Sequence, residues 1–449
     1  MQVLKEILPN LGDIFNVIKI FFVYGGWVPF MVGLIYMLYY LYIHEIQAHF
    51  DRIQQWTFLE IKVPKINISS TLAVESIFSQ MHALHRSLTF LERKVEGQFQ
   101  LWYSLEIISM GGKISFIIRV PKSYTNLVQS AVYSHYPDAE IQEIEDYLKN
   151  LKYEGENPDI EIFGTEFKLS ESHFIPIRTY EDFEHNVAEE KVIDPLKNLF
   201  ETLQNLDPWE FFGIQILIRP TQDDEWKPKA KEYINKLIGE KAQHEIKFSD
   251  LLLKPFNLLA NFSYKNFVAK AVSNAHEEIQ STAKNNWMNM TEGEKQRVSL
   301  VEKKLTKPAY LTKIRHLYIA PKGKYNKMRR FEIIGAYRHF SSGFFNLLKI
   351  DSRSWTKGEP FFSPTLEKAY TDWKTEQLKR RHFKGYKNRS MYLGMQPMIL
   401  SVEEIATLYH FPITGKEGQL LGSILSVPSK KSQPPADLPV AEYYENPQT

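Results

Sequence analysis

The sequence of 449 residues contains no cysteine. Disulfide bonds, thiolate zinc sites and cysteine nucleophiles are therefore excluded, and nothing indicates an oxidising compartment. A phosphate-binding loop is also missing, because GGKIS at Gly111 and TGKEG at Thr414 lack the upstream glycine that the motif requires. No metal-ligand or nucleophile spacing can be recognised either. The sequence thus predicts a protein that is not an enzyme, with no catalytic residue, metal site or cofactor.

One long uncharged run stands near the beginning of the chain. The 24 residues from Ile20 to Ile43 carry no formal charge. Such a run can cross a hydrocarbon core about 30 Å thick once as a helix. We therefore predict an N-terminal segment with a transmembrane helix (residues 1–50, the helix at about 20–43), and a single-pass protein of the inner, cytoplasmic membrane. Basic residues on the two sides of the run weakly favour a cytoplasmic body.

Strand-like and helix-like runs alternate after Trp56. Their order over residues 51–152 is strand, helix, strand, strand, helix, strand, which is the βαββαβ order of a ferredoxin-like domain. Pro64 and Pro121 occupy equivalent strand ends in the two halves of this unit. Proline removes a hydrogen-bond donor from the sheet and disfavours helix at the residue before it. The repeated Val-Pro-Lys is therefore predicted to be architectural and not a binding loop.

The same pattern, a strand-like run that ends at a proline, recurs later in the chain. Pro220 and Pro321 end strand-like runs and predict a second ferredoxin-like domain over residues 153–353, with a helical insertion at about 238–305. Beyond it we predict a basic helical and loop region at 354–425 and a proline-rich tail at 426–449. The predicted fold class is α+β, a single transmembrane helix followed by tandem ferredoxin-like domains.

Charge is distributed unevenly, although the net charge is only +2. Residues 140–190 hold fifteen acidic and four basic residues, whereas residues 303–389 hold twenty-two basic and six acidic residues. Basic side chains neutralise phosphates and interleaved aromatic rings stack bases, so the basic stretch is a candidate for nucleic-acid or partner binding. Docking on acidic residues of this chain or of a partner, and contact with anionic lipid, stay open as alternatives. The candidate residues are Lys322, Lys324, Lys327, Arg329, Arg330, Lys379, Arg380, Arg381, Lys384, Lys387 and Arg389.

Five segments, in order along the chain, are FLEIKVPK, IRVPKSYTNLVQSAVYSHYPDAEI, GEKQRVSLVEKKLTKPAYLTKIRHLYIAPK, LSVEEIATLYHFP and SQPPADLPV. Together they resemble the N-terminal, membrane-anchored half of conjugative-transfer proteins of the type IV secretion kind from candidate-phyla bacteria. In many such proteins the proline-rich segment leads into a coupling-protein or HerA-like ATPase, whereas no Walker motif follows it here. The resembling half is a domain of unknown function, so the resemblance implies no catalytic residue.

The resemblance implies a place in a DNA or protein translocation machine. The expected function is a non-catalytic, membrane-anchored scaffold or assembly module that works with a separately encoded P-loop ATPase. The main alternative is a membrane-tethered nucleic-acid-binding protein that uses residues 303–389, and a hydrolase without a recognisable site is a second. DNA and a second copy of the chain stay open as partners.

Overall fold

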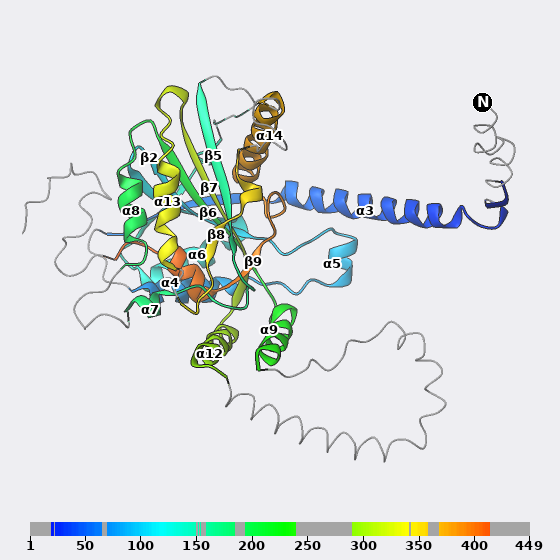
Figure 1. Ribbon diagram of the computed structural model, residues 1–449, viewed down its shortest axis with the longest axis horizontal. Helices are drawn as coiled ribbons and strands as arrows, with labels where there is room; N and C mark the ends of the chain where they lie inside the picture. The colour runs from blue at the N-terminus through cyan, green and yellow to red at the C-terminus, as the bar shows by residue number, and fades with distance from the viewer. Residues whose placement is uncertain are drawn as a thin grey trace, which may run out of the picture. The chain divides into compact units, whose positions relative to one another are not determined.

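The computed structural model describes residues 19–21, 23–64, 70–149, 151, 153, 159–184, 194–238, 290–340, 343–357 and 368–413. The chain forms two compact units, residues 1–56 with 85–101 and residues 57–84 with 102–449. The larger unit is built on a nine-stranded sheet in the order β4-β1-β3-β2-β6-β7-β5-β8, with β9 paired to β7. Figure 1 labels β2, β6, β7, β5 and β8 of this sheet. The strands are β1 (Trp56–Lys62), β2 (Tyr103–Met110), β3 (Lys113–Pro121), β4 (Glu140–Ile144), β5 (Ile160–Leu169), β6 (Phe211–Pro220), β7 (Ala309–Pro321), β8 (Leu348–Ile350) and β9 (Met398–Ser401).

Helices pack on both faces of this sheet. Side chains of a strand alternate between the faces, so Ile214 and Ile216 of β6 join the main apolar core while Leu317 of β7 packs with Phe383 and Tyr386 on the opposite face. The main core includes residues of α4 (Thr71–His82), α6 (Thr125–His135), α8 (Lys197–Gln204), α13 (Arg329–Ala336) and α15 (Val402–Leu408). The opposite face is covered by α14 (Lys368–Lys387).

The prediction of tandem ferredoxin-like domains is wrong, because the strands of both βαββαβ runs belong to one antiparallel sheet. β2 and β6, which the sequence placed in different domains, pair from Tyr103↔Ile218 to Met110↔Phe211. Backbone hydrogen bonds therefore continue from one run into the other, and a single core lies beneath both. The individual strand ends predicted at Pro121, Pro220 and Pro321 are confirmed as the last residues of β3, β6 and β7.

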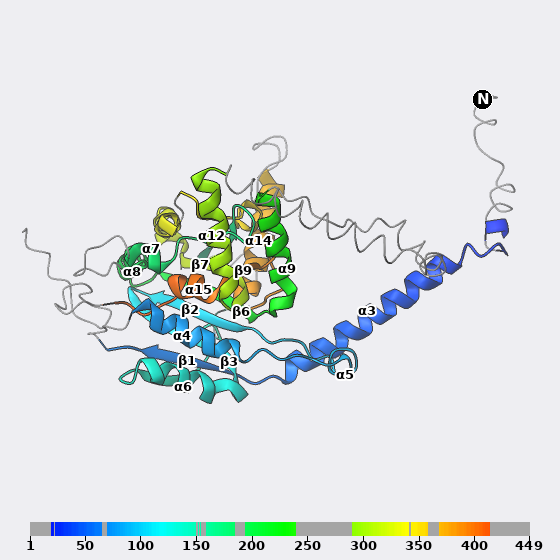
Figure 2. The same cartoon turned by 90° about the horizontal axis from the view of Figure 1, so that it is seen from below.

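The described part of the connection between β6 and β7 contains two helices. α9 (Asp223–Ile238) and α12 (Glu292–Thr306) pack side by side, as Figure 1 and Figure 2 show. Thr291 begins α12 with a capping box, in which its hydroxyl accepts from the Glu294 N–H and the Glu294 carboxylate accepts from the Thr291 N–H. Most of the predicted insertion (239–289) and the predicted tail (426–449) lie outside the described residues.

The predicted transmembrane helix is wrong. Residues 24–27 form a turn, in which Gly25 has a φ of 88°, and the helix α3 (Val28–Ile53) begins only after it. Its C-terminal turns carry Glu45 and Arg52, so the apolar part is shorter than the roughly 20 residues that a crossing needs. In the described part of the chain no helix combines the length and the apolar character needed to span a bilayer. The predicted single-pass location in the cytoplasmic membrane is therefore corrected as well.

The smaller unit combines α3 with the segment 85–101, which contains α5 (Phe90–Lys94). The Phe50 and Phe99 rings meet edge to face at 5.3 Å, and Lys94 Nζ lies 5.2 Å from the centre of the Tyr39 ring. A Cβ on Gly97, which has a φ of 68°, would lie 2.5 Å from the backbone of Ile46. Glycine is therefore required where this segment passes α3.

Candidate functional site

The sheet face beneath α14 carries buried polar side chains. Glu106 of β2 and Gln215 of β6 have no exposed surface, and Arg315 of β7 is 1% exposed. Burial of such groups is unfavourable unless they are hydrogen-bonded and, when charged, paired. α14 and the residues that follow it supply the partners. We therefore treat this polar face together with α14 as the candidate functional site.

Arg389, just beyond α14, is the central cation of this face. Its Nε lies 3.0 Å from Glu106 Oε1 and its Nη1 lies 2.6 Å from Asp146 Oδ2. Burial by itself raises the pKa of Glu106, but the charge and hydrogen bonds of Arg389 outweigh that effect and hold this pKa below its usual value. Gln215 donates to Glu106 Oε1 at 3.1 Å and to the Tyr386 carbonyl at 3.0 Å. The buried carboxylate is thus fully satisfied and fixes the end of α14.

Two glycines allow α14 to approach the sheet closely. A Cβ on Gly164 of β5 would overlap the His382 ring, and a Cβ on Gly213 of β6 would overlap the hydroxyl of Tyr386. Both rings are buried and belong to the sheet-facing side of α14. Glycine within a strand marks such close approach. The absence of two side chains therefore sets the position of the helix.

Further contacts join α14 to the acidic stretch of the chain. Lys379 Nζ lies 2.5 Å from Glu161 Oε1, and Lys387 Nζ donates to the Leu151 carbonyl at 2.7 Å. Tyr153 donates to Glu376 of α14 at 3.0 Å. Among these three contacts, the pair of Lys379 with Glu161 joins a predicted binding residue to an acidic residue of the same chain.

The predicted binding residues separate into two groups. Arg329 pairs with Glu210 at 3.2 Å, and the guanidinium of Arg330 lies 5.7 Å from the centre of the Trp355 ring. Lys379, Lys387 and Arg389 likewise make contacts within the chain. The exposed group comprises Lys322, Lys324, Lys327, Arg380, Arg381 and Lys384.

A small cavity lies beside α14. It has a volume of about 50 Å³ and is lined among others by Glu166, Arg315, Arg381 and His382. Arg315 Nε donates to Glu166 at 2.7 Å, so the charges at its buried end are paired. Substrate pockets usually measure about 300–1,000 Å³. This cavity therefore accommodates a few water molecules and no organic substrate.

Two buried histidines make the stability of this region depend on pH. Burial lowers the pKa of His316 to about 3 and that of His382 to about 4, whereas an unfolded histidine has a pKa of about 6.5. The unfolded chain therefore binds more protons below that pH. We expect the free energy of unfolding to fall as the pH drops below about 6.5, by about 2 kcal/mol per histidine at about pH 5.

Urea unfolding at neutral pH and at about pH 5 measures this effect. His316→Phe keeps a ring among Phe167, Phe212 and Tyr337 but cannot titrate. It should remove about 2 kcal/mol of the pH-dependent loss. An unchanged loss in this variant would show that His316 is not buried as a neutral group.

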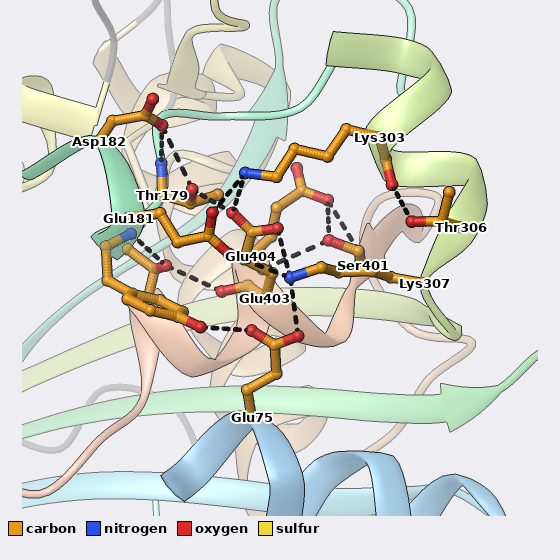
Figure 3. A network of polar contacts seen from close by, with 12 residues as sticks. Glu75, Thr179, Glu181, Asp182, Lys303, Thr306, Lys307, Ser401, Glu403 and Glu404 are labelled. Atoms are coloured by element: carbon orange, nitrogen blue, oxygen red, sulfur yellow. Dashed lines mark hydrogen bonds and ion pairs between the residues drawn. The ribbon is translucent and has the colours of Figure 1, made fainter. Parts of the chain in front are cut away.

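A second polar network joins α4, α7 (Tyr180–Glu184), α12 and α15 (Figure 3). Glu75, Glu181 and Glu403 bring carboxylate oxygens within 4.8 Å of one another. Lys307 Nζ lies 2.8 Å from both Glu75 and Glu403, and Lys303 Nζ lies 2.8 Å from Glu181. The two ammonium groups supply the positive charge that a bound cation would otherwise bring. The cluster is thus an ion-pair network that ties four helices together.

Lys307→Met is expected to lower the free energy of unfolding by about 3 kcal/mol, because Glu75 and Glu403 would lose a largely buried cation. Lys303→Met is the matched control. The Lys303 side chain is 40% exposed against 19% for Lys307, so we expect a loss of no more than about 1 kcal/mol. Urea unfolding followed by tryptophan fluorescence gives both values, and equal losses would contradict this view of the network.

Sequence reasoning missed several residues of the site. Glu106 and Gln215 looked like ordinary polar positions of strands, and their role depends on Arg389, which is 283 positions from Glu106. Gly164 and Gly213 did carry a signal, since glycine inside a strand indicates a close approach. Also missed were aromatic residues with large exposed surfaces, namely Trp209, Tyr370 and Trp373.

The comparison with known families identifies a matching family model. Residues 71–419 match the model of a family described as Domain of unknown function (DUF8128). The matched region begins at the first residue of α4 and extends beyond α15, so it contains the polar face, α14 and the network of Figure 3. No curated protein matches the sequence.

Proposed function

The chain belongs to the DUF8128 family, and we propose that it acts as a non-catalytic assembly module of a type IV secretion-like translocation apparatus. It works there with a separately encoded P-loop ATPase. The resemblance of five ordered segments to conjugative-transfer proteins supports the setting. The contacts that fix α14 against the sheet support the role as an assembly module.

α14 is the observation that carries this proposal. Its sheet-facing side is fixed by Arg389, by the pair of Lys379 with Glu161 and by the close fit of Tyr386 over Gly213. Its outer side exposes basic residues, of which Arg381 and Lys384 are three positions apart and share one face. A rigid helix with an exposed basic face suits docking on an acidic protein surface.

The charges of the site favour binding over chemistry. Glu106 accepts from Arg389, Arg315 donates to the Gly385 carbonyl of α14, and the cavity beside Arg315 holds only about 50 Å³. Lys313, whose pKa is lowered to about 8 by burial and by Arg315, donates to the carbonyls of Met391 and Leu393. These groups stabilise one arrangement of the helix and the loop that follows it.

Affinity capture of the full chain from its source cells, followed by mass spectrometry, tests the proposal. We expect a P-loop ATPase to be recovered with the unmodified chain. The double variant Arg381→Glu/Lys384→Glu should reduce its recovery at least about tenfold, because charge reversal at an interface costs several kcal/mol. Lys231→Glu/Lys236→Glu on α9 makes the same charge change at exposed positions elsewhere and should leave recovery unchanged. Absence of any P-loop ATPase from a folded, captured chain would contradict the proposal.

A further inference from the structure

Aromatic side chains from two distant parts of the chain lie beside the two lysines that follow the end of β7. Lys322 and Lys324 follow Pro321 in a short 3-10 helix, η2 (Lys322–Lys324). Lys324 Nζ lies 3.9 Å from the centre of the ring of Trp209, which precedes β6. Lys322 lines a surface hollow of about 580 Å³ together with Trp373 of α14. We call Trp209, Lys322, Lys324 and Trp373 the β7-end surface.

The rings of this surface are open to solvent. Trp373 is 59% exposed and Trp209 is 43% exposed. Tyr370 lies beside Trp373, with ring centres 6.1 Å apart and an angle of 32° between the ring planes, and Lys374 Nζ lies 5.7 Å from the centre of the Tyr370 ring. Large exposed aromatic rings with ammonium groups beside them can stack unpaired bases while the cations meet phosphates. Paired bases offer no free face for such stacking.

Carboxylates limit how many cations are free here. Asp372 and Glu376 also line the hollow, and Glu376 lies 3.6 Å from Arg380. Lys379 is paired with Glu161, as described above. Of the four residues that define the β7-end surface, the two lysines, Lys322 and Lys324, have no ion pair with a carboxylate of the described residues, so these two can neutralise about two phosphates. The surface therefore offers a large aromatic area for stacking but few free cations. This combination again favours binding of an unpaired strand over a duplex.

We propose that the β7-end surface binds single-stranded nucleic acid without sequence preference. Trp209 and Trp373 stack bases, and Lys322 and Lys324 contact the phosphates between them. This inference goes beyond the assembly role, because it assigns a ligand class to residues that the ATPase contact does not use.

Fluorescence anisotropy with a labelled oligodeoxythymidylate, long enough to fill a site of about 4–16 nucleotides, tests this proposal on the full chain. Log affinity should fall against log salt with a slope of about −1.4, from about −0.7 for each of two phosphates. Trp209→Ala and Trp373→Ala should each weaken binding roughly tenfold, since one stacked base is lost. Tyr133→Ala, which removes an exposed aromatic ring of α6, is the matched control and should have no effect.

Lys322→Glu/Lys324→Glu should also weaken binding and reduce the salt slope towards zero. The proposal is overturned if the tryptophan variants bind like the control, if a duplex binds as tightly as the single strand, or if the folded chain does not bind at low salt. Displacement of the oligonucleotide by polyglutamate without any dependence on the tryptophans would identify a protein-docking surface instead. Recovery of the ATPase with Trp209→Ala/Trp373→Ala should persist, so failure of this inference and failure of the assembly role can be told apart.

Discussion

Arg389→Ala is expected to lower the free energy of unfolding by about 3–5 kcal/mol, because it leaves Glu106 buried without its cation. Glu106 has no exposed surface, and only 2% of the Arg389 side chain is exposed. Arg389 also adopts a φ of 48°, a left-handed conformation that costs a non-glycine residue about 1–2 kcal/mol and that the ion pairs offset. Urea unfolding of the full chain measures the loss.

Arg353→Ala is the matched control for this prediction. Arg353 also pairs with a carboxylate, that of Asp351, at 2.9 Å, but 70% of its side chain is exposed. Lys168, 3.2 Å from Asp351, still pairs with this carboxylate when Arg353 is removed, so Arg353→Ala should lower the free energy of unfolding much less than Arg389→Ala does. If the two arginine variants lost similar amounts, the buried ion pair would not be what fixes α14.

Gly213→Ala should lower the free energy of unfolding by about 1–3 kcal/mol, because the added methyl group overlaps the Tyr386 hydroxyl beneath α14. The direction of this change in the free energy of unfolding is informative. Where the backbone permits it, replacing glycine by alanine stabilises a protein by about 0.4–1 kcal/mol through the unfolded state. A loss therefore reports steric overlap and not a general effect of the substitution.

Two further variants isolate the cause. Gly335→Ala lies in α13, where an added Cβ meets nothing within 4 Å, and it should stabilise the protein by up to about 1 kcal/mol. Tyr386→Phe removes the overlapping hydroxyl, so Gly213→Ala should be better tolerated in that background than in the unmodified chain. Equal effects of Gly213→Ala and Gly335→Ala would contradict the close packing of α14.

The sequence predicted individual strands well but not how they combine. Proline at 121, 220 and 321 marks strand ends because it lacks a hydrogen-bond donor, and this local rule held. The pairing of β2 with β6 is a long-range choice between strands of similar composition, which a pattern of single residues does not encode. Both strands are buried on both faces, but β2 carries Ser104, Glu106 and Ser109 and so lacks the continuous apolar run that would have indicated a central position in a sheet. The prediction of a transmembrane helix failed for another reason. The apolar run at residues 20–43 was counted as one helix, although a turn that contains Gly25 interrupts it.

The candidate site could be predicted only as a region. An excess of basic residues at 303–389 is visible in the sequence, but their partners are far away along the chain, as with Arg389 and Asp146 at a separation of 243 positions. Composition therefore cannot separate the cations that hold α14 from the exposed ones. Trp209 was missed for the same reason, since only the fold brings it to Lys324.

The most direct test of the proposed assembly role is whether the purified full chain forms a complex with any P-loop ATPase that affinity capture recovers. Gel filtration with light scattering at physiological salt gives the mass of the mixture. We expect a co-eluting complex that persists with Trp209→Ala/Trp373→Ala and is lost with Arg381→Glu/Lys384→Glu. Separate elution of the two folded proteins, or a complex that is indifferent to the charge reversal on α14, would contradict an assembly module that docks through this helix.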